Sequence, residues 1–152
     1  MRFAVTRIGM KYRKNIRLKY YNYKNNGFYF VTICSSKRLS YFNRYQKIIV
    51  NRLDKIPMKF AGVDIDYVKV MPDHVHIIFI LENSTKSLAQ IIQWFKSSTT
   101  LLVKRKGFSR EYFWQPNYYE HVIRNDKALT RIREYIENNP LAEKLNWSEL
   151  DS

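Results

Sequence analysis

The sequence predicts an α+β fold, a ferredoxin-like split β-α-β arrangement with a four-stranded antiparallel sheet and an added C-terminal helix. Apolar residues recur in the order strand, helix, strand, strand, helix, strand, helix. A connection of only three residues, 71–73, separates the two middle strands, so they are expected to pair as antiparallel neighbours. With 152 residues, of which 45% are hydrophobic, the chain is long enough for one domain with a buried core.

The first half of the chain supplies three of the four strands. Residues 28–34 are rich in aromatic and β-branched side chains and are typical of a central strand. Apolar residues at helical spacing then predict a helix over 45–56, which is expected to stop at Pro57. Partial alternation over 63–70 predicts a half-exposed strand, followed by a strongly apolar strand that ends near Leu81.

The second half begins with a long helix. Residues 87–90 resemble a capping box, and apolar residues continue at helical spacing from there. A fourth strand is predicted over 118–123. Asn125 or Asp126 is expected to cap a last helix, which ends near residue 139 because Pro140 follows.

The composition favours a polyanionic partner. Lys and Arg outnumber Asp and Glu by 27 to 13, which gives a formal charge of +14. Nucleic acid is favoured over membrane, and the 16% aromatic residues suit stacking on unpaired bases. Residues 1–27 form a basic N-terminal arm without an acidic residue, in which Arg13, Lys14 and Arg17 are candidate phosphate contacts. A solvated tail explains this arm equally well, and 28–152 forms the domain proper.

The chain has no feature of a membrane or secreted protein. No apolar run is long enough to span a bilayer, and the N-terminus lacks the apolar core of a signal peptide. The single cysteine, Cys34, rules out an intramolecular disulfide. We therefore expect a cytoplasmic protein, associated with the nucleoid if its partner is DNA.

Two of the three histidines of the chain, His74 and His76, stand at the start of the apolar strand. Because alternate residues of a strand share a face, both imidazoles project from the same side and can share one metal ion. On the last helix, Tyr135 and Asn139 lie one turn apart at the edge of an apolar stripe. An amide oxygen can coordinate a hard divalent cation, so Asn139 is a candidate third ligand. Without Tyr135 and Asn139, ordinary hydrogen bonding at a strand edge would explain the two histidines better than a metal site.

Five segments resemble known DNA-processing enzymes. His-Val-His at 74–76 resembles the HUH motif of single-strand endonucleases, in which U is a bulky hydrophobic residue. Together the segments resemble the REP-associated tyrosine transposases of the insertion-sequence transposase superfamily. They are Tyr-Phe-Val-Thr-Ile at 29–33, Met-Pro-Asp-His-Val-His at 71–76, Phe-Lys-Ser-Ser-Thr-Thr at 95–100, Trp-Gln-Pro at 114–116 with Tyr-Glu-His-Val-Ile-Arg-Asn at 119–125, and Tyr-Ile-Glu-Asn-Asn-Pro-Leu at 135–141.

The resemblance implies roles for individual residues. His74, His76 and Asn139 would hold a divalent metal, magnesium or manganese, and Tyr135 would be the nucleophile that forms a 5′-phosphotyrosine bond. The partner would be single-stranded DNA next to an imperfect hairpin. A non-catalytic hairpin-binding module for DNA or RNA on the same fold is the alternative, although such a module has no need of all four residues. A replication initiator or relaxase is disfavoured, because Asn138 stands where initiators commonly carry lysine.

Further residues of these segments are candidate DNA contacts. For Lys96 and Arg124, phosphate contact and solvated surface charge are balanced interpretations. For His121 an ordinary structural role is the favoured interpretation, and a supporting position behind the metal site or DNA contact is the alternative. Trp114 can stack on a base, although we favour a place in the core. The sequence leaves a monomer and a homodimer open, and with them whether Tyr135 serves its own chain or a partner.

Overall fold

The computed structural model describes residues 26–138, which fold into four strands and three α-helices. The expected N-terminal arm, apart from its last two residues, and Asn139 lie outside these residues. The elements, in chain order, are β1 (Gly27–Cys34), a 3-10 turn η1 (Ser36–Arg38), α2 (Gln46–Lys59), β2 (Val63–Val70), β3 (His74–Leu81), α3 (Leu88–Arg105), β4 (Tyr119–Ile123) and α4 (Asp126–Asn138).

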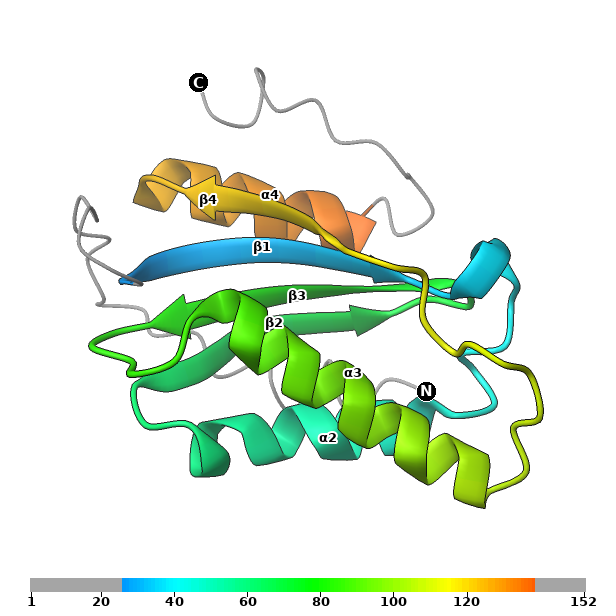
Figure 1. The fold of residues 1–152 in the computed structure, drawn as a ribbon. Helices are drawn as coiled ribbons and strands as arrows, with labels where there is room; N and C mark the ends of the chain where they lie inside the picture. Colours follow the sequence, from blue (N-terminus) through cyan, green and yellow to red (C-terminus); the bar gives the residue numbers. More distant parts are fainter. Residues whose placement is uncertain (1–25, 139–152) are drawn as a thin grey trace.

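The strands form one antiparallel sheet in the order β2-β3-β1-β4, with helices on both faces. Helices α2 and α3 cover one face, and α4 lies on the other (Figure 1). This is the order of a split β-α-β fold, in which β3 lies between β1 and β2, the two strands that α2 connects, and β4 pairs with the other edge of β1. The predicted fold class, including the added C-terminal helix, is confirmed.

Each face of the sheet has its own hydrophobic core. The larger core joins α2 and α3 to one set of alternating strand residues, such as Ile33 and Ile77. The smaller core joins α4 to the other set, such as Phe30 and Ile78. All eight residues of β3 are buried, because this strand is central and covered on both faces. A polar side chain on β3 is therefore withdrawn from water.

Two local features differ from the expectations. Helix α2 continues through Pro57 to Lys59, so the prediction that it stops at Pro57 is wrong. Proline lacks one N–H, but in the last turn this removes a single hydrogen bond, and the Phe60 N–H still donates to the Ile56 carbonyl oxygen at 2.9 Å. Strand β2 carries a bulge between Ile65 and Tyr67, which breaks its strict alternation.

The helix caps follow the sequence closely. The Ser87 hydroxyl accepts from the Gln90 N–H, and the Gln90 side chain accepts from the Ser87 N–H, which completes the expected capping box of α3. At the start of α4, the Asn125 side chain accepts a hydrogen bond from the Ala128 N–H at 2.7 Å. Both caps satisfy N–H groups that have no partner within the helix.

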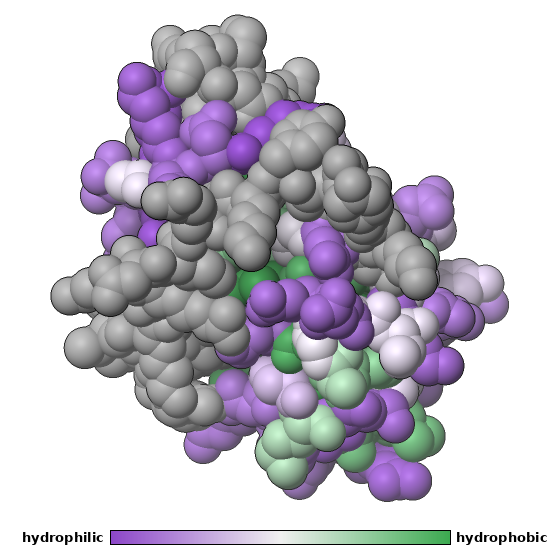
Figure 2. Space-filling model, turned by 90° about the vertical axis from the view of Figure 1, so that its left-hand side faces the viewer, coloured by the Kyte–Doolittle hydropathy of each residue, from purple (hydrophilic) through white to green (hydrophobic). Residues whose placement is uncertain are grey.

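At the end of the molecule where β1 begins, hydrophilic residues predominate and apolar ones appear in small patches (Figure 2). No helix in residues 26–138 is long and apolar enough to cross a membrane.

Candidate metal and nucleophile site

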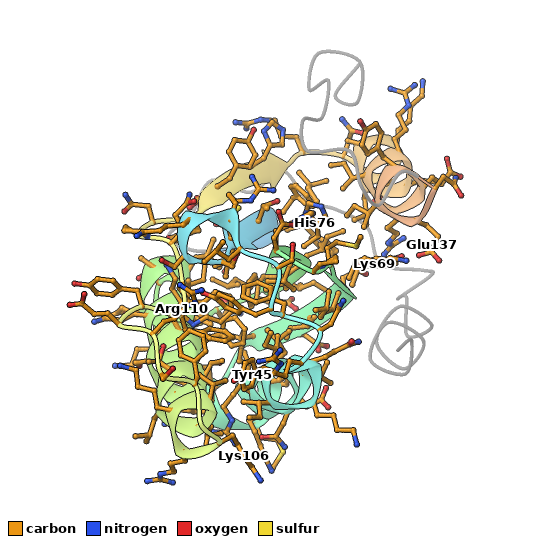
Figure 3. The ribbon with its side chains drawn as sticks, turned by 90° about the vertical axis from the view of Figure 1, so that its right-hand side faces the viewer. Tyr45, Lys69, His76, Lys106, Arg110 and Glu137 are labelled. Atoms are coloured by element: carbon orange, nitrogen blue, oxygen red, sulfur yellow. The ribbon has the colours of Figure 1, made fainter. Side chains whose placement is uncertain are left out.

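The two strand histidines face the side of the sheet that α4 covers. Alternation places His74 and His76 on the same face as Ile78 and Ile80, and both isoleucines belong to the α4 core. The ring centroids of the two histidines are 4.7 Å apart. The expected pair of adjacent imidazoles is therefore present, at the end of the sheet shown in Figure 3.

Each imidazole is held by a hydrogen bond to its Nδ1 atom. His74 Nδ1 lies 2.7 Å from Asp73 Oδ1, and His76 Nδ1 lies 2.9 Å from Thr32 Oγ1. Thr32 is opposite His76 on β1, and the His76 ring also stacks on Phe30 at 5.3 Å between centroids. Both Nδ1 atoms are thus occupied by protein groups, which leaves Nε2 of each ring for another partner.

The Nε2 atom of His74 is buried and has no hydrogen-bond partner among residues 26–138. His74 is only 4% exposed and His76 5%. Buried polar atoms are nearly always hydrogen-bonded, so an exception points to a missing partner. A metal ion is a partner that fits, because the second nitrogen of a metal-binding histidine usually donates to a carboxylate or other oxygen acceptor, as the Nδ1 of His74 does here.

The electrostatics of the site keep His76 neutral. Burial, reinforced by the neighbouring His74, lowers the pKa of His76 to about 3. A neutral imidazole keeps a lone pair for coordination, whereas an imidazolium has none. Burial by itself would raise the pKa of Asp73, but the hydrogen bond with His74 and the charge of Arg38 outweigh it and hold this pKa below its usual value.

The described residues supply two ligands and leave the third untested. Within residues 26–138, no group of three His, Cys, Asp or Glu side chains is placed to hold a metal. The expected third ligand, Asn139, follows the last described residue directly. Two imidazoles together with an amide oxygen form a donor set that suits a divalent cation, so the residues fit the ion that the resemblance implied.

Tyr135 lies on α4, the helix that covers the histidine face. The helix runs toward the end of the sheet where β3 begins with His74 (Figure 1). Leu129, Ile132 and Ile136 form the expected buried stripe, and Tyr135 is half-buried against the same core.

An ion pair fixes one flank of α4. Arg133 donates from Nε to Asp66 Oδ2 at 2.9 Å and from Nη2 to Asp66 Oδ1 at 2.5 Å. Asp66 sits at the bulge of β2, so this bidentate pair ties the helix to the β2 side of the sheet. At roughly 100° per residue, Tyr135 lies on the opposite flank of the buried stripe, toward β1 and β4.

Trp114 and Lys96 stabilise the segment that leads into β4. Trp114 is 6% exposed, and its Nε1–H donates to the Lys96 carbonyl oxygen at 3.1 Å. Lys96 Nζ donates to the carbonyl oxygens of Gln115 and Asn117 at 3.0 and 2.9 Å, and burial lowers its pKa. The Trp114 ring offers little surface to a base, so core packing explains this residue better. DNA contact by Lys96 stays a prediction.

The remaining candidates are spread over two regions. His121 lies on β4 opposite Phe30, on the histidine face of the sheet, and Arg124 is exposed just beyond that strand. Arg13, Lys14 and Arg17 lie outside the described residues. Contact between these residues and DNA is therefore untested.

Sequence reasoning missed four residues that support the site. Asp73 and Thr32 bind the two histidines, Arg38 binds Asp73, and Asp66 fastens α4. Asp73 and Thr32 both lie inside segments that carry the family resemblance, 71–76 and 29–33, which was the available signal. Arg38 and Asp66 lie outside those segments, and no local pattern marks them.

Comparisons with known proteins identify relatives of the whole described region. Residues 23–139 match the family model described as transposase IS200 like. An uncharacterized protein of Haemophilus influenzae is 35% identical, over 88% of this chain and 91% of its own length. A second protein of that organism, provisionally named a REP-associated tyrosine transposase, is 25% identical over 79% of this chain and 73% of its own length.

Two solved structures share the fold. A REP-associated tyrosine transposase bound to a REP hairpin superposes with a TM-score of 0.67 and 23% identity, over 81% of this chain and 72% of that one. A protein of Deinococcus radiodurans, provisionally described as a transposase, gives a TM-score of 0.55 and 18% identity, over 79% of this chain and 94% of that one.

Proposed function

The chain belongs to the IS200-like transposases, as its resemblance to the REP-associated tyrosine transposases predicted, and from that premise we propose that it nicks and rejoins single-stranded DNA beside hairpins through Tyr135. One observation carries this proposal. The His74–His76 pair is buried on the sheet face covered by the helix of Tyr135, and Nε2 of His74 lacks a protein partner among the described residues.

In this proposal His74, His76 and Asn139 hold a magnesium or manganese ion. Bound there, the ion would act as a Lewis acid that polarises the scissile phosphate. The protein keeps the ligands ready: burial holds His76 neutral, and the Asp73 carboxylate holds His74 by its Nδ1 atom. His76 therefore has no proton to lose before coordination.

Tyr135 performs the covalent step. Its phenolic oxygen bonds to phosphorus while the bond from phosphorus to the 3′ oxygen breaks, and the phenol proton leaves to a base or to solvent. The departing strand takes up a proton and ends in a 3′-hydroxyl, and the other strand end stays attached as a 5′-phosphotyrosine. A 3′-hydroxyl that attacks this linkage restores Tyr135 and joins two strands without ATP, because the covalent bond preserves the energy of the broken one.

The partner in this proposal is hairpin DNA with an unpaired flank. The net charge of +14 favours a polyphosphate, and one relative of the same fold was solved with a REP hairpin. His121 borders the site from β4, opposite Phe30, whereas Arg124 lies past the far end of that strand, where a longer DNA segment would reach it. Arg13, Lys14 and Arg17 would extend the contact along phosphates. A protein with this partner would reside on the nucleoid in the cytoplasm.

The test is cleavage of a labelled hairpin oligonucleotide with magnesium or manganese, followed on denaturing gels. The parent protein should give a shortened labelled strand and a covalent protein–DNA band, and Tyr135→Phe should give neither while still binding the hairpin. Tyr112→Phe is the matched control, because Tyr112 is exposed in the segment before β4 and should be dispensable. Cleavage by Tyr135→Phe at the parent rate would disprove the assignment of the nucleophile. Hairpin binding without an adduct under any divalent metal would instead support the non-catalytic binding module.

The packing of α4 favours a site completed within one chain. The helix buries its apolar stripe on its own sheet and is tied to it by the Arg133–Asp66 pair. An equimolar mixture of His76→Ala and Tyr135→Phe proteins should therefore remain inactive. Recovery of about a quarter or more of the parent activity would show that Tyr135 acts on the metal site of a second copy, since random pairing restores one intact shared site in half of the dimers.

A further inference from the structure

We propose that Arg38 and Asp73 form a positioning chain that fixes the tautomer and orientation of His74. This inference deepens the proposed function and rests on it, because it concerns how one metal ligand is prepared. The chain runs from a guanidinium through a carboxylate to an imidazole, and it joins the η1 turn to the first residue of β3.

The distances define the proton on His74. Asp73 Oδ1 is 2.7 Å from His74 Nδ1, and Asp73 Oδ2 lies 3.2 Å from Arg38 Nε and 3.1 Å from Arg38 Nη2. An ionised carboxylate only accepts hydrogen bonds, so Nδ1 of His74 must carry the proton and donate it. In the neutral ring Nε2 then holds the lone pair, in the position where the described residues offer no hydrogen-bond partner.

Arg38 holds the carboxylate in the orientation that this arrangement needs. Its Nε and Nη2 atoms both meet Asp73 Oδ2, while Asp73 Oδ1 meets His74, so the carboxylate bridges the guanidinium and the imidazole. A charged carboxylate is a stronger acceptor than a protonated one, and it raises the basicity of the opposite ring nitrogen. The arginine therefore acts on the metal ligand through Asp73 and does not touch it.

The backbone of the η1 turn places Arg38 beside Asp73. Lys37 and Arg38 both adopt left-handed backbone conformations, with φ of 55° and 57°, which non-glycine residues rarely do. Hydrogen bonds to the turn before β3 hold the segment: the Ser35 N–H donates to the Asp73 carbonyl oxygen and the Phe42 N–H to the Pro72 carbonyl oxygen, both at 2.9 Å. Two consecutive residues in an unfavourable conformation persist only where the surroundings enforce them, and here the result is the Arg38–Asp73 contact.

The second histidine is held differently. His76 Nδ1 meets the Thr32 hydroxyl, which can donate or accept, so this contact fixes the position of the ring but does not select a tautomer. His74 alone is backed by a charged acceptor that is itself held in place. The positioning chain thus prepares one ligand in the metal-free protein, before any ion or DNA arrives.

The experiment measures the ring nitrogens of the metal-free protein by ¹⁵N NMR, with chelator present. The sequence has only three histidines, so their signals can be assigned by substitution. In the parent protein His74 should be protonated on Nδ1. Asp73→Asn should give a mixture of tautomers, because an amide can either donate or accept. Manganese binding, followed by electron paramagnetic resonance, should weaken by about 10–100-fold in Asp73→Asn.

Two further variants separate positioning from folding. Arg38→Gln removes the guanidinium without touching His74, and its manganese affinity should fall between those of the parent and Asp73→Asn. Lys37→Gln is the matched control from the same left-handed turn, and its manganese affinity should equal that of the parent. If Asp73→Asn does not fold, the His74 tautomer of the parent protein and the manganese affinity of Arg38→Gln still test the positioning chain.

The results can overturn this inference independently of the proposed function. Protonation of His74 on Nε2 in the parent protein, or parental manganese affinity in both Asp73→Asn and Arg38→Gln, would refute the positioning chain. If the tautomer and affinities follow the expectation but the parent makes no covalent adduct with hairpin DNA, the positioning chain stands and the proposed function fails.

Discussion

The burial of His76 predicts a specific loss of stability in mild acid. An unfolded chain protonates histidine with a pKa near ~6.5, whereas the folded protein holds the pKa of His76 at about 3. Between these values the unfolded state binds more protons than the folded state, so the free energy of unfolding rises with pH and falls as the solution is acidified. The contribution is complete above pH ~6.5 and is lost progressively toward pH ~3.

The magnitude follows from the two pKa values. Lowering the pH from ~7.5 to ~5 should cost about 2 kcal/mol through His76, since each fully developed pH unit is worth about 1.4 kcal/mol. The pKa of Asp73, which is also lowered, adds a loss of the same sign, but mainly below pH ~4. The chosen interval therefore isolates the imidazole from this carboxylate.

The assay is urea unfolding at the two pH values, with chelator present so that no metal stabilises the folded state. His76→Gln removes the titrating group, and its stability should change between the two pH values by about 2 kcal/mol less than that of the parent. Thr32→Val is the matched control, because it removes the hydrogen bond to His76 but keeps the ring. This control should be less stable at both pH values and should retain the pH dependence. Equal pH dependence in His76→Gln and the parent would refute the reasoning.

Three structural features give further predictions. Arg133→Met leaves the Asp66 carboxylate, whose side chain is 1% exposed, without its guanidinium, and should cost about 3–5 kcal/mol in urea unfolding. Adding Asp66→Asn to that variant should recover part of the loss; no recovery would mean that the pair does not act as a unit. Gly62→Ala should destabilise by more than about 1 kcal/mol, because φ is +82° and the new Cβ would lie 2.5 Å from the Glu82 carbonyl oxygen. A melting temperature equal to that of the parent would contradict this. Ser87→Ala should cost about 1 kcal/mol by removing the capping box, as a small drop in melting temperature, and should leave hairpin cleavage unchanged.

The sequence predicts the parts of this fold that depend on neighbours in the chain. Alternation along 74–81 is enough to place both histidines on one face, and the cap at Asn125 is enough to start α4. The order of elements also predicts the sheet, but that α4 covers the histidine face is seen only in the structure. Before that, Tyr135 was joined to the histidines through the family resemblance alone.

Contacts between distant segments could not be predicted in this way. Arg38 and Asp73 are 35 residues apart, and Asp66 and Arg133 are 67 apart. Asp66 depends on a β-bulge, which changes the facing of residues and leaves no mark in a period-two pattern. Pro57 is a case in which a local rule gave a wrong prediction. Proline disfavours the interior of a helix, but in the last turn of α2 it removes only one hydrogen bond, so the helix continues to Lys59.

The buried ionisable side chains are distributed unequally over the two faces of the sheet. Within residues 26–138, the buried carboxylate and imidazole side chains are those of Asp66, His74 and His76. All three lie on the face of the sheet that α4 covers, whereas α2 and α3 cover the opposite face. Burying a carboxylate or an imidazole costs free energy unless it finds a partner. The α4 face of the sheet therefore contributes less to the free energy of unfolding than a fully apolar face would. The larger core therefore stabilises the sheet, and the stability that it supplies offsets the cost of burying Asp66, His74 and His76 under α4.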